Sequence, residues 1–163
     1  MNRRNFQPIT PEMDEDIDSY LAFPPFMTLV SLNGVNIEIS DLETLKPCIW
    51  LNDNIINTVL YLITSDSPPS FAFPTYFIQA YQQQGYVGVR RWTKKIDPGN
   101  TGELFSQRMV FIPLNPNRNH WTLVAINVSV KTITYYDSFG GRDQVMLKIQ
   151  IEQFLIIYIY SPF

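Results

Sequence analysis

The fold is constrained most by two neighbouring apolar segments, WTLVAINV at residues 121–128 and TITYY at residues 132–136. Both are rich in the β-branched and aromatic residues that favour strands. Both also carry apolar residues on two faces, so we expect central strands that are covered on both sides. A two-residue connection at Ser129-Val130 would make them an antiparallel hairpin, and residues 108–113 are a third strand candidate.

Helical segments precede and follow these strands. Helical periodicity or capping residues predict helices at residues 10–21, 52–64, 75–85 and 142–154. The first of these has Thr10 as its N-cap and Pro11 at the first helical position. The third ends at Gly85, a residue suited to the position just after a helix.

Two shorter elements lie between the first and second helical segments. Residues 29–39 alternate apolar and polar side chains around Asn33-Gly34, a strong two-residue signal for a hairpin. Ser40 followed by Glu43 is the signature of a capping box, which predicts a short helix there. Residues 65–70 are expected to form a loop.

The composition predicts a globular domain that binds neither nucleic acid nor membrane. The chain has 163 residues, of which 45% are hydrophobic and 17% charged, so we expect one domain with a buried core. A net charge of −3 gives no general attraction to phosphate backbones. A single cysteine excludes an internal disulfide and argues against a cysteine-ligated zinc site, and it fits a reducing intracellular compartment. The longest apolar run, residues 154–160, is too short to cross a bilayer.

The only histidine in the chain, His120, lies just before the first strand of the hairpin, and Asp137 just after the second. With a two-residue connection, facing residues have numbers that sum to 259, which places Asp137 opposite Thr122 and diagonal to His120 on the same face. The spacing therefore predicts a pair in which the carboxylate fixes the imidazole tautomer and the other ring nitrogen acts as a base toward serine or cysteine. The alternative is a capped histidine and an aspartate that closes a turn before Gly140-Gly141.

Four short motifs occur in an order that resembles a known enzyme family. They are WLNDNIIN at residues 50–57, GYVGVRRWTKKID at residues 85–97, HW at residues 120–121 and ITYYDSFGG at residues 133–141. Their order and contexts resemble those of the Ulp1/SENP family of SUMO-specific cysteine proteases, the C48-type peptidases, over about residues 9–155. The resemblance implies an α+β, papain-like cysteine protease fold in which helices flank a central sheet.

The resemblance also implies a function and its partners. Family members are thiol proteases that cleave the peptide or isopeptide bond after the Gly-Gly tail of SUMO, to process SUMO precursors or to remove SUMO from lysines (deSUMOylation). The partners would be SUMO or SUMO-conjugated proteins, with no cofactor and no metal. The protein would be an intracellular, nuclear monomer. Which SUMO paralogue is bound, and whether precursors or conjugates are cut, stay open.

The catalytic residues of the family correspond to two positions in this sequence. His120 would be the general base and Asp137 the residue that orients it. The family nucleophile is a cysteine in an Asp-Cys-Gly motif downstream of the aspartate, after a glutamine that helps to bind the oxyanion, and the sequence contains no such motif. The only cysteine is Cys48, in the segment PCIW, and we expect it to be an inert, buried residue.

Three further positions resemble the substrate-binding residues of the family. Trp50 and Trp121 resemble the walls of a tunnel that admits only the narrow glycine tail, and core packing is the alternative for each of them. Asp53 resembles the aspartate that meets a basic residue of the modifier. An N-cap role in the helix at residues 52–64, which either Asn52 or Asp53 could fill, explains Asp53 equally well.

Residues 1–163 are therefore expected to form a single Ulp1-like protease domain that is incomplete at its C-terminus, with residues 156–163 as an atypical tail. A base and its orienting carboxylate cannot form a thioester without a nucleophile, so this chain is expected to be inactive. One alternative is a catalytically dead module that binds a ubiquitin-like modifier through Trp50, Asp53 and Trp121. Another is a non-functional fragment that results from an erroneous gene prediction.

Overall fold

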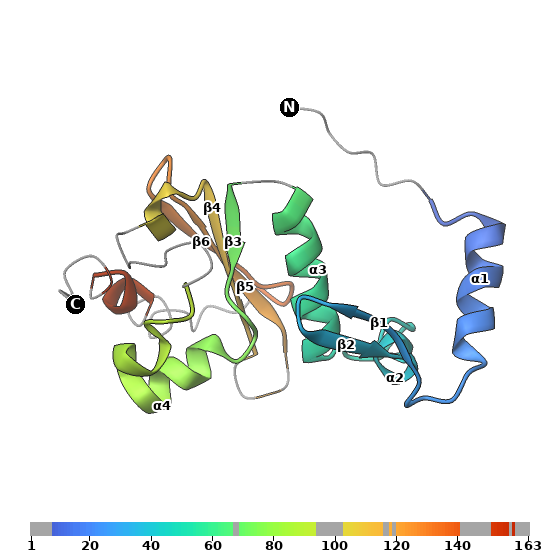
Figure 1. Ribbon diagram of the computed structural model, residues 1–163. Coiled ribbons are helices and arrows are strands. Elements are labelled where there is room, and N and C mark those ends of the chain that lie inside the picture. Colours follow the sequence, from blue (N-terminus) through green and yellow to red (C-terminus); the bar gives the residue numbers. More distant parts are fainter. Residues whose placement is uncertain are drawn as a thin grey trace. The chain divides into compact units, whose positions relative to one another are not determined.

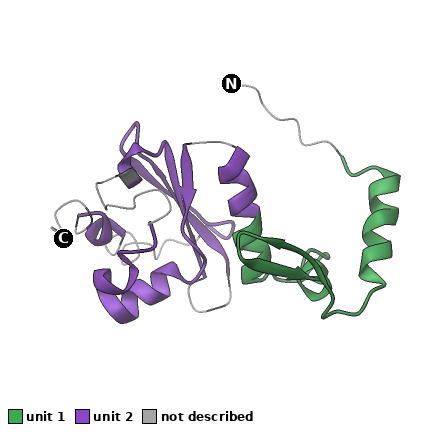
Figure 2. Ribbon diagram, viewed as in Figure 1, with its two compact units in different colours: residues 1–58 green, residues 59–163 purple. Residues whose placement is uncertain are grey.

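The structure is a computed structural model that describes residues 8–66, 69–93, 103–115, 118, 120–140, 151–156 and 158 (Figure 1). Part of the second motif, residues 94–97, and most of the last predicted helix, residues 142–150, lie outside the described residues. The chain divides into two compact units, residues 1–58 and residues 59–163 (Figure 2). The boundary falls within helix α3 (Asp53–Asp66).

Helix α1 (Pro11–Leu21) begins as the sequence predicts. The Thr10 hydroxyl accepts a hydrogen bond from the Met13 backbone N–H at 3.3 Å, and Pro11 takes the first helical position. The contact satisfies a donor that the first turn would otherwise leave unpaired. None of the side chains of α1 is buried, so capping rather than burial determines where the helix starts.

Strands β1 (Thr28–Leu32) and β2 (Val35–Glu38) form the predicted hairpin. They are antiparallel and are joined directly by Asn33-Gly34. Both turn residues have a positive φ, 50° and 80°, as a hairpin turn with two left-handed residues requires. The prediction from the Asn-Gly signal is therefore confirmed.

Helix α2 (Ile39–Glu43) begins one residue before the expected capping box, and that box is a wrong prediction. Ser40 already lies within the helix, where its backbone N–H donates to the Pro25 carbonyl oxygen at 2.8 Å. The Asp41 carboxylate instead accepts a hydrogen bond from the Glu38 backbone N–H at 2.7 Å. Asp41 thus fills the role that the sequence pattern assigned to a later glutamate, because it lies three positions after the true cap.

Among the described residues, unit 2 is built on a four-stranded sheet in the order β3-β4-β5-β6. Its strands are β3 (Ser70–Ala72), β4 (Met109–Leu114), β5 (Thr122–Asn127) and β6 (Thr132–Tyr136), and a 3-10 helix, η1 (Glu103–Ser106), precedes β4. β3 pairs with β4 in parallel and the other neighbours are antiparallel. The three strands predicted from the sequence are confirmed. Strand β3 is an addition, and its first residue, Ser70, was expected to belong to the loop at residues 65–70. A strand of three residues that lies between prolines is too short for an alternating pattern to reveal it.

The register of the β5–β6 hairpin is the predicted one. Leu123 pairs with Tyr136 and Asn127 with Thr132, and in both pairs the residue numbers sum to 259. β5 is central and mostly buried, but β6 lies at the edge of the described sheet and exposes alternate residues. The expectation that both strands are covered on two faces is therefore wrong for β6, because its threonine and tyrosine side chains tolerate water on one face.

Buried apolar residues of unit 2 form one core. The sheet contributes Val110, Ile112, Leu114, Val124 and Ile126, and helix α4 (Phe77–Val89) contributes Phe77, Ile78, Tyr81 and Val89. Phe154 and Tyr158 belong to the same core, and the Phe154 ring lies 5.0 Å from that of Phe77. Burial in this core raises the pKa of Tyr81.

Gly85 interrupts helix α4 rather than ending it. Its φ is 64° and its ψ is −166°, a conformation that is essentially limited to glycine. The sequence predicts the special conformation of this residue correctly, but a further helical turn follows and ends at Val89.

Candidate active site

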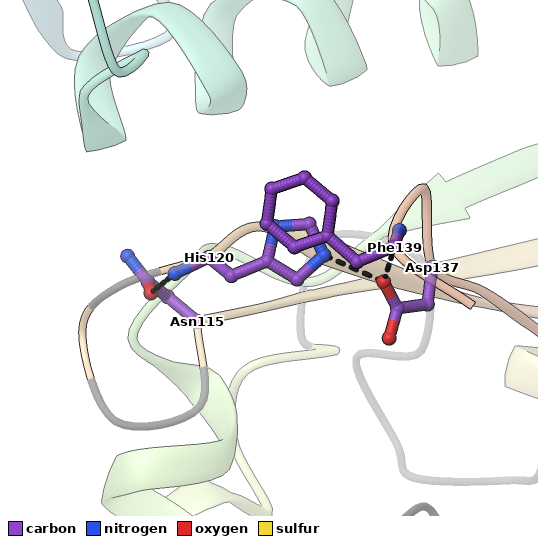
Figure 3. A network of polar contacts seen from close by, with 4 residues as sticks. All are labelled: Asn115, His120, Asp137 and Phe139. Carbon is purple, nitrogen blue, oxygen red and sulfur yellow. Dashed lines mark hydrogen bonds and ion pairs between the residues drawn. The ribbon is translucent and has the colours of Figure 1, made fainter. Parts of the chain in front are cut away.

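The pairing of strands β5 and β6 brings His120 and Asp137 together (Figure 3). His120 precedes β5 and Asp137 follows β6, so both lie at the same end of the hairpin. His120 Nε2 and Asp137 Oδ1 are 2.6 Å apart, which is a short hydrogen-bond distance. The two side chains are only 13% and 10% exposed, so water competes little for this contact. The histidine–aspartate pairing predicted from the spacing is confirmed.

Backbone contacts hold each member of the pair. Asn115 Oδ1 accepts a hydrogen bond from the His120 backbone N–H at 3.2 Å. Asp137 Oδ1, the oxygen that contacts the imidazole, also accepts one from the Phe139 backbone N–H at 2.8 Å. The Gly140 backbone N–H donates to the Asp137 carbonyl oxygen at 3.1 Å, which closes a turn. Asp137 therefore closes a turn and pairs with histidine at the same time, so the two alternatives from the sequence do not exclude each other.

A carboxylate beside Nε2 determines what the imidazole can do. When the Nε2–H group donates to Asp137, the neutral ring carries its lone pair on Nδ1, and that nitrogen is the proton acceptor. Once the ring of His120 accepts a proton, its contact with Asp137 becomes an ion pair. The arrangement therefore leaves Nδ1 as the ring nitrogen that can accept a proton, with the carboxylate orienting the ring.

Phe139 belongs to the site and was missed by the reasoning from sequence. Its ring lies face to face with the imidazole of His120, with centroids 4.1 Å apart and planes inclined by 18° (Figure 3). The residue is nevertheless 73% exposed. A phenylalanine within a polar turn carries no signal of contact with a distant residue. The one available clue is its place two residues after Asp137, where a turn folds the chain back.

The predicted substrate-binding residues lie in both units. Trp121 directly follows His120 in unit 2 and is half-buried. Trp50 and Asp53 lie in unit 1, and both are exposed. Because Trp50 is 57% exposed, core packing does not account for this tryptophan.

Helix α3 is capped by Asn52 and not by Asp53. Asn52 Oδ1 accepts a hydrogen bond from the Ile55 backbone N–H at 3.1 Å, and the helix begins at Asp53, as predicted for a helix with Asn52 as its cap. As the first helical residue, the exposed Asp53 carboxylate interacts favourably with the positive end of the helix. The capping role that could have explained Asp53 without any partner protein therefore belongs to its neighbour.

A buried carboxylate holds the two residues that flank Asp53. Asp41 is only 4% exposed, and its Oδ1 accepts hydrogen bonds from Asn52 Nδ2 at 2.6 Å and Asn54 Nδ2 at 3.1 Å. Its Oδ2 accepts the hydrogen bond from the Glu38 backbone. We call Asp41, Asn52 and Asn54 the asparagine clamp. Hydrogen bonds to a buried carboxylate are costly to break, so the clamp fixes the start of α3.

Cys48 is exposed, which contradicts the expectation of a buried apolar residue. It lies within residues 44–52, which form turns and irregular backbone without a helix or strand. Such segments run over the surface because their backbone polar groups would lack hydrogen-bond partners if they were buried. Cys48 also has a φ of 63°, which is uncommon for a residue other than glycine.

In the described parts of the chain, no three histidine, cysteine, aspartate or glutamate side chains are grouped so that they could hold a metal ion. The helices that the structure describes are all too short or too polar to cross a lipid bilayer.

Comparisons with known sequences identify the family. Residues 50–160 match the family described as "Ulp1 protease family, C-terminal catalytic domain". The chain is 32% identical over 133 residues to ubiquitin-like-specific protease 1 of Saccharomyces cerevisiae, a match that covers 82% of this chain and 21% of that protein. It is 32% identical over 149 residues to sentrin-specific protease 2 of Mus musculus, covering 88% of this chain and 24% of that protein. The chain thus spans between a fifth and a quarter of the length of these relatives.

Solved structures agree with this assignment. The C-terminal Ulp1 protease domain in complex with SMT3, the yeast ortholog of SUMO, matches with a TM-score of 0.81 and 29% identity, over 93% of this chain and 69% of that one. SUMO protease Ulp1 with its catalytic cysteine oxidized to a sulfinic acid matches with a TM-score of 0.80 and 29% identity, over 93% and 68%. The chain belongs to the Ulp1 protease family, and it has the α+β fold of that family's protease domain, as the sequence motifs predict.

Replacing Asp41 with alanine should lower the free energy of unfolding by about 2–3 kcal/mol, because the amides of Asn52 and Asn54 lose their buried acceptor. Urea unfolding followed by tryptophan fluorescence measures the change. The control is Glu43→Ala on the same helix, whose exposed contact with Lys46 at 3.4 Å should contribute less than about 1 kcal/mol. Equal losses in the two variants would contradict a structural role for the clamp.

Proposed function

We propose that the protein is the catalytic part of a SUMO-specific cysteine protease, which processes SUMO precursors, carries out deSUMOylation, or both. The observation that carries this proposal is the 2.6 Å contact between His120 Nε2 and Asp137 Oδ1 in a chain of the Ulp1 protease family. The names of its relatives support the substrate, since they are ubiquitin-like-specific and sentrin-specific proteases. The Ulp1 domain solved in complex with SMT3 supports SUMO as the partner.

In the proposed reaction His120 is the general base and Asp137 orients it. His120 takes the proton of a cysteine thiol, and the thiolate attacks the carbonyl carbon of the last glycine of SUMO. The tetrahedral intermediate collapses when His120 gives that proton to the leaving amine, which leaves SUMO joined to the enzyme by a thioester. Water then gives a proton to His120 and attacks the thioester, and the departing sulfur takes the proton back. The chemistry requires no metal or organic cofactor.

The thiol of this reaction is proposed to come from a residue other than Cys48. In the family that the motifs resemble, the nucleophile follows the aspartate, whereas Cys48 is the one cysteine among these 163 residues and precedes it. We therefore propose that the two units belong to one protease domain, and that hydrolysis needs an Asp-Cys-Gly segment that these residues do not contain. The family match over residues 50–160, which spans both units, supports the single domain.

Recognition of SUMO is proposed to use Trp50, Trp121 and Asp53. Each indole would contact the Gly-Gly tail, where a flat ring leaves no room for a side chain on the substrate. Asp53 would meet a basic residue of SUMO, a role supported by its exposure and by the capping of α3 through Asn52. The protein would act as a monomer inside the cell, in the nucleus, as the family resemblance implies.

A binding module that does not cleave its partner is the second candidate function. The observation that favours it is the single cysteine, Cys48, which lies outside the sequence context of the family nucleophile. Such a pseudoprotease would hold SUMO through Trp50, Asp53 and Trp121 without hydrolysing it. An Asp-Cys-Gly motif in transcript sequence downstream of residue 163 would favour the enzyme over the binding module.

Trp121→Ala should weaken the binding of SUMO to this chain by about tenfold or more, because an aromatic anchor that contacts the tail is removed. Isothermal titration calorimetry measures the affinity for mature SUMO and for SUMO that lacks its two terminal glycines. We expect the shortened SUMO to bind the wild-type chain as weakly as mature SUMO binds the variant, with no further loss when the two changes are combined. The control is Phe26→Ala, because Phe26 is another exposed aromatic residue, at 76%. If the loss of affinity from Trp121→Ala and the loss from deleting the two glycines add up in full, Trp121 does not contact the tail.

Asp53→Ala should weaken SUMO binding by about threefold at low salt, because one surface ion pair is lost. The difference in affinity between the wild type and Asp53→Ala should diminish as salt is added, because salt screens the ion pair that only the wild type forms. Glu12→Ala is the matched control, because Glu12 is also an exposed carboxylate in the first turn of a helix in unit 1. The same loss of affinity in both variants would point to net charge rather than to a contact of Asp53.

Joining the family's Asp-Cys-Gly segment to this chain should produce an enzyme that releases a fluorogenic amide from the SUMO C-terminus. In that enzyme His120→Ala should lower kcat about a thousandfold or more, because the thiol loses its base. The control is Val130→Ala at the opposite end of the same hairpin, which should retain full activity. Undiminished hydrolysis by His120→Ala would refute the general-base role.

A further inference from the structure

We propose that Phe139 is a positioning residue that sets the plane of the His120 imidazole. The inference rests on the proposed function, in which this imidazole is the general base. The phenyl ring covers one face of the imidazole at a centroid distance of 4.1 Å (Figure 3). The Phe139 backbone N–H donates at 2.8 Å to the same Asp137 oxygen that contacts Nε2. One residue therefore contacts both members of the pair.

A single hydrogen bond does not define the plane of a ring. The contact between His120 Nε2 and Asp137 Oδ1 places one atom of the imidazole, but the ring can still tilt within the wide range that a hydrogen bond tolerates. A face-to-face aromatic contact limits this tilt, because rotation of the ring would separate or overlap the two faces. The two rings are inclined by only 18°, so the phenyl group sets the plane and with it the direction of Nδ1. A general base must keep that direction to accept a proton efficiently.

The backbone turn, and not burial, holds Phe139 in this place. The residue is 73% exposed, so the hydrophobic effect contributes little to fixing its ring. The Gly140 backbone N–H donates to the Asp137 carbonyl oxygen at 3.1 Å, and Gly140 has a φ of 69°, which a residue with a side chain rarely adopts. The turn thus directs the phenyl ring onto His120.

The phenyl ring of Phe139 is also compatible with the positive charge that His120 would carry during catalysis. The face of a phenyl ring attracts cations, so the stacked contact remains favourable when the imidazole carries the proton of the thiol. The Asp137 carboxylate contacts the ring edge at Nε2, and the Asn115 side chain accepts a hydrogen bond from the His120 backbone. His120 is therefore held by its backbone, its edge and one of its faces, each by a different residue.

Nuclear magnetic resonance of the 163-residue chain tests this proposal without any enzymatic activity. His120 is the only histidine, so its ring signals are unambiguous. A phenyl ring stacked on the imidazole shifts the imidazole protons upfield through its ring current. Phe139→Leu should therefore move the signals of these protons downfield. Because the ring can then tilt away from Asp137, the chemical shifts of the two ring nitrogens should move toward the average of the two tautomers. Phe139→Tyr keeps a flat ring and should leave both sets of signals close to the wild type.

Phe26→Leu is the matched control, because Phe26 is exposed to a similar extent, 76%, and lies in unit 1. Its His120 signals should equal those of the wild type. Unchanged His120 signals in Phe139→Leu, in a variant with the wild-type circular dichroism spectrum, would overturn the proposal. If Phe139→Leu does not fold, nuclear Overhauser contacts between the two rings of the wild type decide: their presence supports the stacking and their absence overturns it.

The failure of the proposed function has a different signature. If the chain does not bind SUMO but the His120 signals respond to Phe139→Leu as expected, the positioning role stands and the protease assignment fails. In the enzyme with the added cysteine, Phe139→Leu should lower kcat by about tenfold and leave KM unchanged. A raised KM at unchanged kcat would instead make Phe139 a SUMO contact and overturn its positioning role.

Discussion

The candidate site depends on the register in which β5 and β6 pair. Successive side chains of a strand point to opposite faces, so a slip by one residue would place His120 and Asp137 on opposite sides of the sheet. Apolar residues hold this register, because Ile126 of the core lies opposite Ile133, which packs against that core. A slip would also turn these side chains toward water. The burial of apolar pairs along the hairpin therefore determines the position of a polar pair at its end.

Each unit contains a carboxylate that is shielded from water and surrounded by donors from nearby sequence. Asp137 receives the Phe139 backbone N–H besides the imidazole, and Asp41 receives the Glu38 backbone N–H besides two asparagine side chains. A shielded carboxylate without such donors would be strongly unfavourable. In both cases a backbone donor two or three residues away supplies one hydrogen bond, and motif side chains supply the rest: His120 for Asp137, and Asn52 and Asn54 for Asp41. The motifs HW and WLND thus contribute to the fold as well as to the candidate function.

Features that depend on local spacing could be predicted from the sequence, and features that depend on packing could not. The pairing of His120 with Asp137 follows from a hairpin whose short connection determines its register. The contacts of Asp41 with Asn52 and Asn54 span 11 and 13 residues without regular structure between them, so no periodicity indicates them. The stacking of Phe139 on His120 depends on the direction in which a turn leaves the strand. That direction follows from backbone angles, which residue types only partly determine.

The contacts described for the histidine–aspartate pair come from the β5–β6 hairpin, from the turn after β6 and from Asn115, which follows β4. Strand pairing, the turn after β6 and the hydrogen bond from His120 to Asn115 involve no thiol. The contact between His120 and Asp137 is therefore present in a sequence that contains no Asp-Cys-Gly motif. Trp50 and Asp53 are exposed, so the proposed binding of SUMO through these residues can be tested apart from hydrolysis. A chain that lost only its cysteine would keep both the base and the residues proposed to recognise SUMO, so activity and binding have to be measured separately.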